Sequence, residues 1–143
     1  PANLFPYVSQ VAVGKLEKVE VFGRDWPTPD GSPVRDYIHV MDLAEGHRAA
    51  LEVLQCEEPQ LLTLNLGSGK GHSVLEVVRA FEIASARPIP YVISSRRFGD
   101  AACSVADASL AATRLGWSTK RNLADMCRDS WAWQLANPSG YMP

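Results

Sequence analysis

The most constraining feature of the sequence is segment 34–47, in which strand-forming residues run directly into an amphipathic helix. Val34 to Ile38 is predicted to be a strand, and Asp42 to Leu54 a helix. Arg35 and Tyr37 alternate with their neighbours and therefore point to the same side of that strand. A guanidinium fixed on a strand presents a fork of donors that fits phosphate or carboxylate oxygens. The segment predicts half of an anion-binding site, although an arginine paired with Asp36 or another carboxylate would have the same sequence.

A second basic segment, Ser94 to Asp100, can supply the other half of such a site. Arg96 and Arg97 are adjacent and are followed by Gly99 and Asp100. Arginine binds a diphosphate bidentately, and a nearby carboxylate accepts hydrogen bonds from sugar hydroxyls. The combination is typical of a nucleotide-sugar site, whereas two adjacent arginines alone are more often a solvated pair.

The rest of the pattern alternates helices with strands, which predicts an α/β fold. The helix 42–54 is expected to bury an apolar stripe made of Leu43, Ala50, Leu51 and Leu54. Capping residues mark the starts of three further helices, and glycines mark helix ends. The predicted elements are a helix from Leu4 to Val13 ended by Gly14, a strand from Val19 to Phe22, a strand from Leu61 to Leu66, a helix started by Ser73 and Glu76 and continuing through Val77, Val78 and Phe81, a strand from Ile89 to Ile93, a short helix capped by Asp107 and stopped by Gly116, and a last helix capped by Asn122 that packs Leu123, Cys127 and Trp131.

Composition favours one folded domain spanning residues 1–143. With 143 residues and 46% hydrophobic residues, the chain can bury a single core. A net charge of −2 gives no basic field for nucleic acid. The sequence contains no apolar run of about eighteen residues and no signal-like start, so we expect no membrane association and a cytoplasmic location. The cysteines are predicted to be reduced and structural, and the histidines have no metal-ligand spacing; these residues are Cys56, Cys103, Cys127, His39, His47 and His72.

Four separated motifs together resemble one known family. They are segments 23–31, 35–47, 65–69 and 96–100. In this order they are similar to the carboxyl-terminal part of the UDP-glucose 4-epimerase family, which belongs to the extended short-chain dehydrogenases/reductases. The resemblance runs from Asn3 to Tyr141. It implies a small mixed α/β substrate-binding domain without the Rossmann half, and an isomerase of galactose metabolism that interconverts UDP-glucose and UDP-galactose through a 4-keto intermediate on NAD.

Two parts that the family uses for catalysis are missing from this sequence. The glycines of 67–72 do not form a dinucleotide-binding turn, because the third glycine of that fingerprint falls on His72; they are predicted to form an ordinary turn. The family also uses a tyrosine with a lysine four residues later, but Tyr7, Tyr37 and Tyr91 are followed at that spacing by Val11, Met41 and Ser95, and Tyr141 lies too near the end. We therefore expect no catalytic residue, no NAD bound by this chain alone and no turnover without a Rossmann partner.

The resemblance implies roles for individual side chains. Arg35 and Arg97 match the arginines that hold the UDP diphosphate, and Asp100 matches the acid that contacts the uridine ribose. A small residue at Ser104, where some relatives carry a bulky one, suggests room for an N-acetylated sugar. The full set of predicted substrate-binding residues is Asn3, Leu4, Glu20, Phe22, Arg35, Tyr37, Val74, Arg97, Asp100 and Ser104.

Two alternatives stay open from the sequence alone. Phe22 and Val74 are equally compatible with simple core packing. The chain as a whole can also be a non-catalytic module that binds a nucleotide sugar or docks on a Rossmann partner. In either case, apolar faces left without their partner predict self-association.

Overall fold

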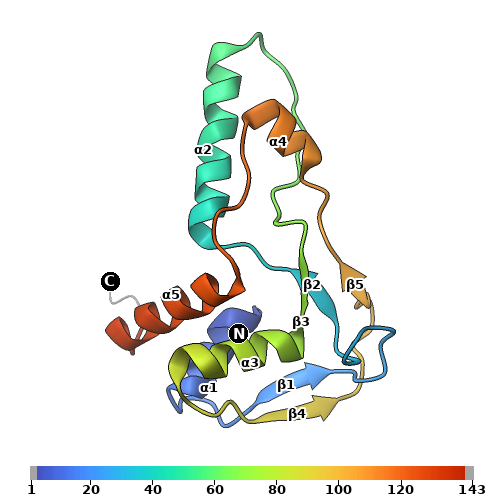
Figure 1. Cartoon of the computed structure of the whole chain (residues 1–143), viewed down its shortest axis with the longest axis vertical. Coiled ribbons are helices and arrows are strands. Elements are labelled where there is room, and N and C mark those ends of the chain that lie inside the picture. The colour runs from blue at the N-terminus through green and yellow to red at the C-terminus, as the bar shows by residue number, and fades with distance from the viewer. Residues whose placement is uncertain (1–2, 141–143) are drawn as a thin grey trace.

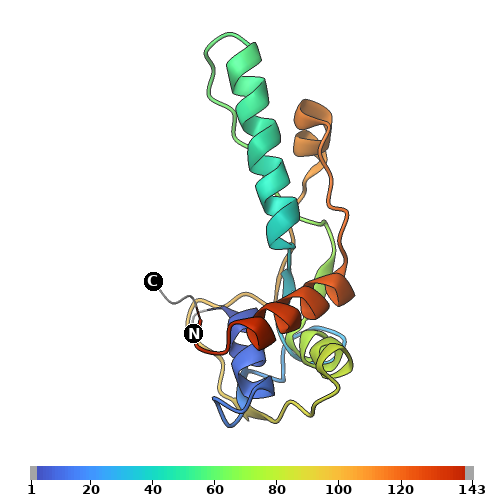
Figure 2. The same ribbon diagram turned by 90° about the vertical axis from the view of Figure 1, so that its left-hand side faces the viewer.

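The computed structural model describes residues 3–140 and divides them into a broad body and a projecting arm (Figure 1). The body contains the first described residues and the two sheets, and the arm extends away from it in both views (Figures 1 and 2). We use "arm" for α2 (Val40–Cys56), α4 (Ser109–Leu115) and the segment 57–66 between α2 and the sheet. The body is formed by α1 (Leu4–Ala12), β1 (Val19–Phe22), β2 (Val34–Asp36), β3 (Gly71–Ser73), α3 (Val74–Ser85), β4 (Tyr91–Ser94), β5 (Cys103–Ser104) and α5 (Leu123–Ala136).

Three helices and one strand enclose the core of the body. α1, α3 and α5 pack against one another, and β1 packs against α1. The sequence dictates this arrangement, because each helix carries its apolar residues on one face. The fully or nearly buried members of the core are Val8, Val11, Ala12, Val19, Val78, Phe81, Ile89 and Cys127. Leu123 and Trp131 pack against this core, as predicted for the last helix.

The capping residues correctly predicted the starts of two of these helices, α3 and α5. The Ser73 side chain accepts a hydrogen bond from the Glu76 N–H, and the Glu76 carboxylate accepts one from the Ser73 N–H. The same reciprocal capping box joins Asn122 and Asp125 at the start of α5. Both boxes satisfy backbone donors that a helix start otherwise leaves free.

Strand pairing brings the two predicted anion-binding segments together. β1 and β4 are parallel, with Phe22 opposite Ser94. The loops that follow these strands, 23–33 and 95–100, therefore begin at the same end of the pair. β2 lies at the centre of the second sheet, antiparallel to β3 and parallel to β5, with Arg35 opposite Ser104.

The arm is held together around the inner face of α2. Asp42 is completely buried and forms an ion pair with Arg121. The Trp117 indole donates to the Asp42 carbonyl oxygen at 3.0 Å. A Cβ at Gly46 would lie only 3.0 Å from Leu66 and 3.1 Å from Trp117, so a glycine there allows close packing. The inner face of α2, which packs on Leu66 and Trp117, thus consists of a carboxylate and a glycine rather than a run of leucines.

This arrangement contradicts the apolar stripe predicted for α2. Leu43 and Ala50 are half-buried, but Leu51 and Leu54 are 59% and 45% exposed. The expectation failed because it placed the whole stripe in one core.

The predicted strand from Leu61 to Leu66 is not formed. Neither sheet within residues 3–140 includes this segment. Its alternating apolar residues fit a strand, but a strand needs a hydrogen-bonded neighbour, and none of the described strands lies beside it. Leu61 is almost fully exposed at the far end of the arm.

Smaller differences concern element boundaries and the cysteines. β2 ends at Asp36 rather than Ile38, and β4 begins at Tyr91 rather than Ile89. α4 has Ala108 as its N-cap, while the Asp107 carboxylate accepts from the Ser109 N–H just before the helix. All three cysteines are free thiols; Cys127 is in the core, whereas the exposed Cys56 and Cys103 have no packing role.

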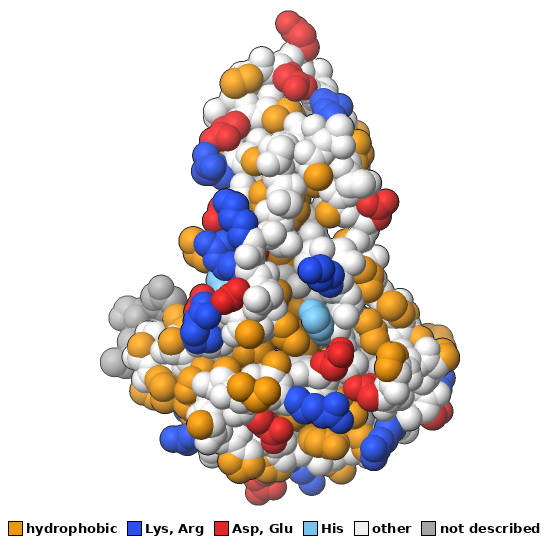
Figure 3. Space-filling view, in the orientation of Figure 1, with side chains coloured by type: hydrophobic (Ala, Val, Ile, Leu, Met, Phe, Trp, Pro, Cys, Tyr) orange, Lys and Arg blue, Asp and Glu red, His pale blue; other side chains and the backbone are white. Residues whose placement is uncertain are grey.

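Residues 3–140 contain neither a membrane-spanning helix nor a cluster of metal-ligand side chains. None of the described helices is long and apolar enough to cross a membrane. Within the same residues, no three His, Cys, Asp or Glu side chains form a group able to hold a metal ion. On the face in Figure 3, basic and acidic side chains are interspersed with apolar ones rather than separated into large fields of one charge.

Candidate functional site

A cavity of about 290 Å³ lies where the start of α1 meets β1, β2, the start of α3 and the loop 95–100. Nine of the ten predicted substrate-binding residues line it: Asn3, Leu4, Glu20, Phe22, Arg35, Tyr37, Val74, Arg97 and Asp100. They come from five segments that are distant in sequence. We call this cavity the arginine cavity.

Arg35 is fixed by backbone oxygens and by Asp100. One guanidinium nitrogen donates to the carbonyl oxygens of Val34 and Ala101, both at 2.8 Å. The other lies 3.9 Å from a carboxylate oxygen of Asp100. These contacts hold the side chain in one orientation, with part of its donor fork turned toward the cavity.

Asp36 is not the partner of Arg35; the ion pair that the sequence allowed is formed with another carboxylate, Asp100. The Asp36 carboxylate accepts hydrogen bonds from the backbone N–H groups of Ser68 and Gly69, each at 3.0 Å. It therefore fastens the turn 67–70 to β2. The guanidinium of Arg35 remains available to the cavity and to Asp100.

Arg97 forms an ion pair with the same carboxylate, three residues after it in the chain. Its Nε donates to Asp100 Oδ2 at 2.9 Å, and a second nitrogen donates to Oδ1 at 3.3 Å. The guanidinium carbon lies 4.4 Å from the centre of the Phe22 ring, a cation–π distance. Two arginines thus share one aspartate, and Glu20 is the second carboxylate of the cavity wall. Since these groups are partly exposed, their ion pairs stabilise the fold little.

Tyr37 forms the wall between the arginine cavity and a neighbouring one. Its ring meets the edge of Phe5, with 5.6 Å between ring centres. Burial raises the pKa of Tyr37 to about 12, although the positive charge of Arg35 acts in the opposite direction. The hydroxyl is therefore neutral near pH 7 and can donate or accept a hydrogen bond.

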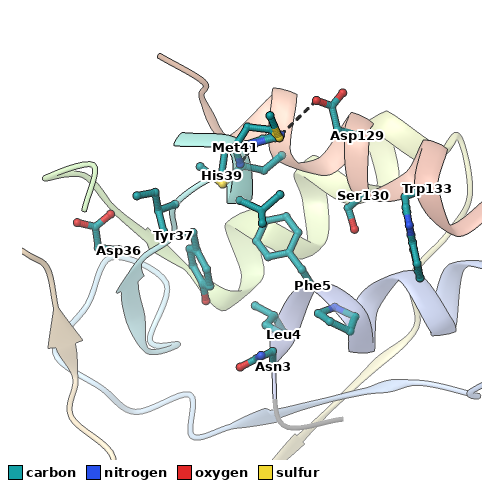
Figure 4. A pocket seen from close by; sticks show the side chains of 14 residues that line it. Asn3, Leu4, Phe5, Asp36, Tyr37, His39, Met41, Asp129, Ser130 and Trp133 are labelled. Carbon is teal, nitrogen blue, oxygen red and sulfur yellow. Dashed lines mark hydrogen bonds and ion pairs between the residues drawn. The ribbon is translucent and has the colours of Figure 1, made fainter. Parts of the chain in front are cut away.

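The neighbouring cavity is larger, about 810 Å³, and mostly apolar (Figure 4). It shares Asn3, Leu4 and Tyr37 with the arginine cavity and extends toward α5. At its far side His39 Nδ1 accepts from the Met41 N–H at 3.1 Å. Because that nitrogen is an acceptor, Nε2 carries the proton and donates to Asp129 at 3.2 Å.

Two of the residues singled out from the sequence lie outside the arginine cavity. Ser104 is an exposed residue of β5 opposite Arg35, but it does not line the wall. Arg96 turns away toward Asp25 and Trp26. Adjacent arginines in the sequence therefore have different surroundings.

Tyr7 and Pro33 also line the cavity but were not predicted. Tyr7 lies one helical turn after Asn3, and its N–H bonds the Asn3 carbonyl oxygen at 3.3 Å. Helical periodicity applied to Asn3 could have found it. Pro33 carries no comparable signal, because its position depends on how the loop 23–33 folds.

Comparison with known proteins agrees with the geometry. A model of the NAD dependent epimerase/dehydratase family matches residues 1–67. UDP-glucose 4-epimerases from Neisseria meningitidis serogroup C and Bacillus subtilis are each 56% identical to this chain over 99% of its length. The chain is a relative of the UDP-glucose 4-epimerases. It spans about 41% of the length of these curated relatives.

Solved epimerase structures have the same fold. The UDP-glucose 4-epimerase from Bifidobacterium longum, in complex with NAD+ and UDP, superposes with a TM-score of 0.94 and 51% identity, covering 99% of this chain and 42% of the other. The enzyme from Stenotrophomonas maltophila, with bound NAD and formylated UDP-arabinopyranose, gives a TM-score of 0.93 and 54% identity, covering 96% and 41%. The resemblance inferred from four motifs is confirmed.

Although both of these epimerases bind NAD, the glycine-containing turn of this chain does not fit its pyrophosphate. A dinucleotide turn needs free backbone N–H groups, but those of Ser68 and Gly69 are already bound to Asp36. A Cβ at Gly67 would lie 2.6 Å from the Asp36 carboxylate and 2.5 Å from Ala106. The glycine at 67 thus allows close packing on Asp36, as expected for a structural turn.

Proposed function

We propose that this chain forms the UDP-sugar-binding part of a UDP-glucose 4-epimerase. The observation that carries the proposal is the meeting of Arg35 and Arg97 at Asp100 in one cavity. In this proposal the two guanidinium groups hold the diphosphate, and Asp100 accepts from the uridine ribose. Phe22 and Glu20, on the same side of β1, border the uracil.

The paired guanidinium groups of the arginine cavity suit a dianionic bridge. Without ligand, they share the carboxylate of Asp100. A diphosphate would offer both arginines further acceptor oxygens for bidentate contacts. Arg97 lies over one face of the Phe22 ring, so both side chains border the same part of the cavity.

Chemistry in the proposed epimerase needs groups outside this chain. NAD supplies the hydride acceptor when it is bound, and a tyrosine with a partner lysine supplies the base. In this chain Arg35 and Arg97 bind and orient the substrate, and Tyr37 supplies a neutral hydroxyl beside it. We expect these 143 residues alone to hold a UDP-sugar without converting it; UDP-galactose formation by the purified chain would contradict this.

We further propose that the NAD-binding part covers the exposed apolar side of the arm and the larger cavity. Val40, Met41, Leu51 and Leu54 are all exposed on α2. In the absence of that cover, the chain is expected to self-associate, which sedimentation at several concentrations measures. A monomer throughout would contradict the expectation.

The small side chain at Ser104 supports a wider range of sugars. Ser104 is exposed on the strand beside Arg35. Its side chain does not fill the cavity, but its size limits which sugar substituent can lie next to the diphosphate site. We expect the complete enzyme to epimerise UDP-N-acetylglucosamine as well as UDP-glucose. Replacing Ser104 with tyrosine should selectively reduce kcat/KM for the N-acetylated substrate. Equal discrimination by both proteins would end the idea.

Calorimetric titration with UDP tests the binding function. The chain is expected to bind with a Kd of about 1 mM or better. Arg35→Ala and Arg97→Ala should each weaken binding about tenfold or more, since each removes a charge-assisted contact. Arg48→Ala is the matched control, because Arg48 is an exposed arginine of the arm that pairs only with Glu52.

Binding that is unaffected by either cavity arginine would refute the proposed site. A flat titration with the unmodified chain would instead favour the non-catalytic interaction module.

A further inference from the structure

The adjacent arginines of the loop 95–100 make different contacts. Arg97 lies over Phe22 and lines the arginine cavity. Arg96 points to the other side, where its Nε donates to the Asp25 carboxylate at 2.8 Å and a second nitrogen donates to the Asp25 carbonyl oxygen at 2.5 Å. Its guanidinium carbon is 3.9 Å from the centre of the Trp26 ring. Arg96 is thus bound by charge, hydrogen bonds and stacking at once.

The partners of Arg96 are themselves fixed to β1. The Trp26 indole N–H donates to the Phe22 carbonyl oxygen at 3.0 Å, and the Trp26 backbone N–H donates to Gly31 at 3.1 Å. Gly23 has φ +87°, and a Cβ there would lie 2.5 Å from the indole nitrogen and 2.9 Å from Arg96 Cγ. Because Gly23 has no side chain, the Trp26 indole and the Arg96 guanidinium can approach each other.

The rest of the loop has few attachments of its own. Phe98 is fully exposed, and a Cβ added at Gly99 would meet no atom within 4 Å. Among the described residues, Arg96 is the one member of segment 95–99 that forms a hydrogen bond with the loop 23–33. Arg97 bonds only within its own loop, to Asp100.

These contacts form a closed ring of interactions. Trp26 holds the Phe22 carbonyl, the Phe22 ring supports Arg97, Arg97 follows Arg96 in the chain, and Arg96 stacks on Trp26. We propose that Arg96 is a positioning residue for Arg97: its clamp on Asp25 and Trp26 holds the loop so that Arg97 faces the arginine cavity. This inference rests on the proposed function, and it assigns Arg96 a role without contact to the ligand.

The clamp lowers the conformational entropy cost of binding, because it orders the loop 95–100 before the ligand binds. Ordering one long side chain on binding costs about 0.5–1.5 kcal/mol, and loop ordering adds to that cost. Arg96→Ala should therefore weaken UDP binding about three- to tenfold, less than Arg97→Ala. Trp26→Leu removes the stacking partner and should give a similar loss.

Arg96→Lys separates positioning from simple charge. Lysine keeps the positive charge near an anionic ligand, but it has neither the planar fork for Asp25 nor the flat face for Trp26. If Arg96 acts as a clamp, Arg96→Lys should bind UDP nearly as weakly as Arg96→Ala. Recovery of wild-type affinity by lysine would overturn the inference.

A double-mutant cycle tests whether the effect passes through Arg97. In the Arg97→Ala background, Arg96→Ala should cause little further loss of UDP affinity, because there is no cavity arginine left to position. Additive losses would mean that Arg96 binds the ligand independently, which would overturn the proposal. An unchanged affinity for Arg96→Ala in a chain that responds to Arg97→Ala would overturn it too, while leaving the proposed function intact.

A measurement without ligand keeps the two proposals distinct. Chymotrypsin cuts after Phe98, which is present in every variant. Loss of the clamp should raise the cleavage rate at this bond several-fold in Arg96→Ala and Trp26→Leu, but not in Arg48→Ala, with thermal unfolding showing that all the chains remain folded. Equal cleavage rates would contradict the clamp even if UDP bound as proposed. Faster cleavage without UDP binding would support the clamp and contradict the proposed function.

Discussion

The body and the arm contain similar apolar patterns but use them differently. In the body, Val78 and Phe81 of α3 are buried against α1 and α5. In the arm, Leu51 and Leu54 of α2 follow an equally regular helical spacing, yet both are exposed. A helical pattern therefore identifies the face that needs a partner, but not whether the partner lies in the same segment of chain. The arginine cavity lies on the body, whose core is formed by residues of this chain.

The largest expected effect is on the core of the body. Phe81→Ala should lower the free energy of unfolding by about 3–5 kcal/mol, because Phe81 is completely buried and its removal leaves a cavity. Urea unfolding followed by circular dichroism measures this. Ile83→Ala is the matched control on the same helix, since Ile83 is 84% exposed and should change stability by no more than about 0.5 kcal/mol. Similar losses at both positions would contradict the packing of α3.

A smaller effect concerns the carboxylate that joins the loop 23–33 to α3. Asp30 accepts from the Ser32 N–H at 2.9 Å and from the hydroxyls of Ser32 and Ser73 at 2.7 and 2.5 Å. Burial acts to raise the pKa of Asp30, but the hydrogen bonds from Ser73 and Ser32 outweigh it, and the pKa is lowered. Its stabilising effect is therefore complete above the unfolded pKa of about 4 and is lost as the pH falls through the lowered folded value.

Replacing Asp30 with asparagine should remove this share of the pH dependence. At pH 7 the variant should be about 1–2 kcal/mol less stable than the wild type, because hydrogen bonds to a charged acceptor are lost. The difference should shrink when the pH is lowered from 7 to about 3, below the unfolded pKa of about 4, because the unfolded carboxylate then takes up a proton that the folded one resists. Unfolding free energies of both proteins at the two pH values test it, and a constant difference would rule out this role for Asp30.

The contrast between body and arm also explains how much the sequence could predict. Ser73, Asn122 and the apolar faces of α3 and α5 depend on neighbours close in sequence or on a core within the chain, and they were predicted correctly. The segment from Leu61 to Leu66 has the alternation of a strand but no described strand to pair with. Its local pattern is sound, and only the tertiary partner is absent from the described residues.

Within the candidate site, the same limit applies to side-chain direction. The resemblance to the epimerase family indicated Arg35, Arg97 and Asp100, and these three do meet. It could not indicate that Arg96 would turn to Trp26, because that depends on Gly23 and on the way the loop 23–33 folds over β1. The binding roles of these residues remain predictions that UDP titration tests.

The smallest expected effect separates the two regions most directly. Leu51→Ala should change the free energy of unfolding of this chain by less than about 0.5 kcal/mol, since Leu51 is already in water and alanine favours the helix. In a longer epimerase whose NAD-binding part covers the arm, the same substitution should cost about 2 kcal/mol or more, as for a buried leucine. Urea unfolding of both proteins gives the comparison. An equally small effect in the longer protein would mean that the stripe on α2 faces solvent there too. The difference between body and arm would then be a property of the complete enzyme and would not result from the absence of the NAD-binding part.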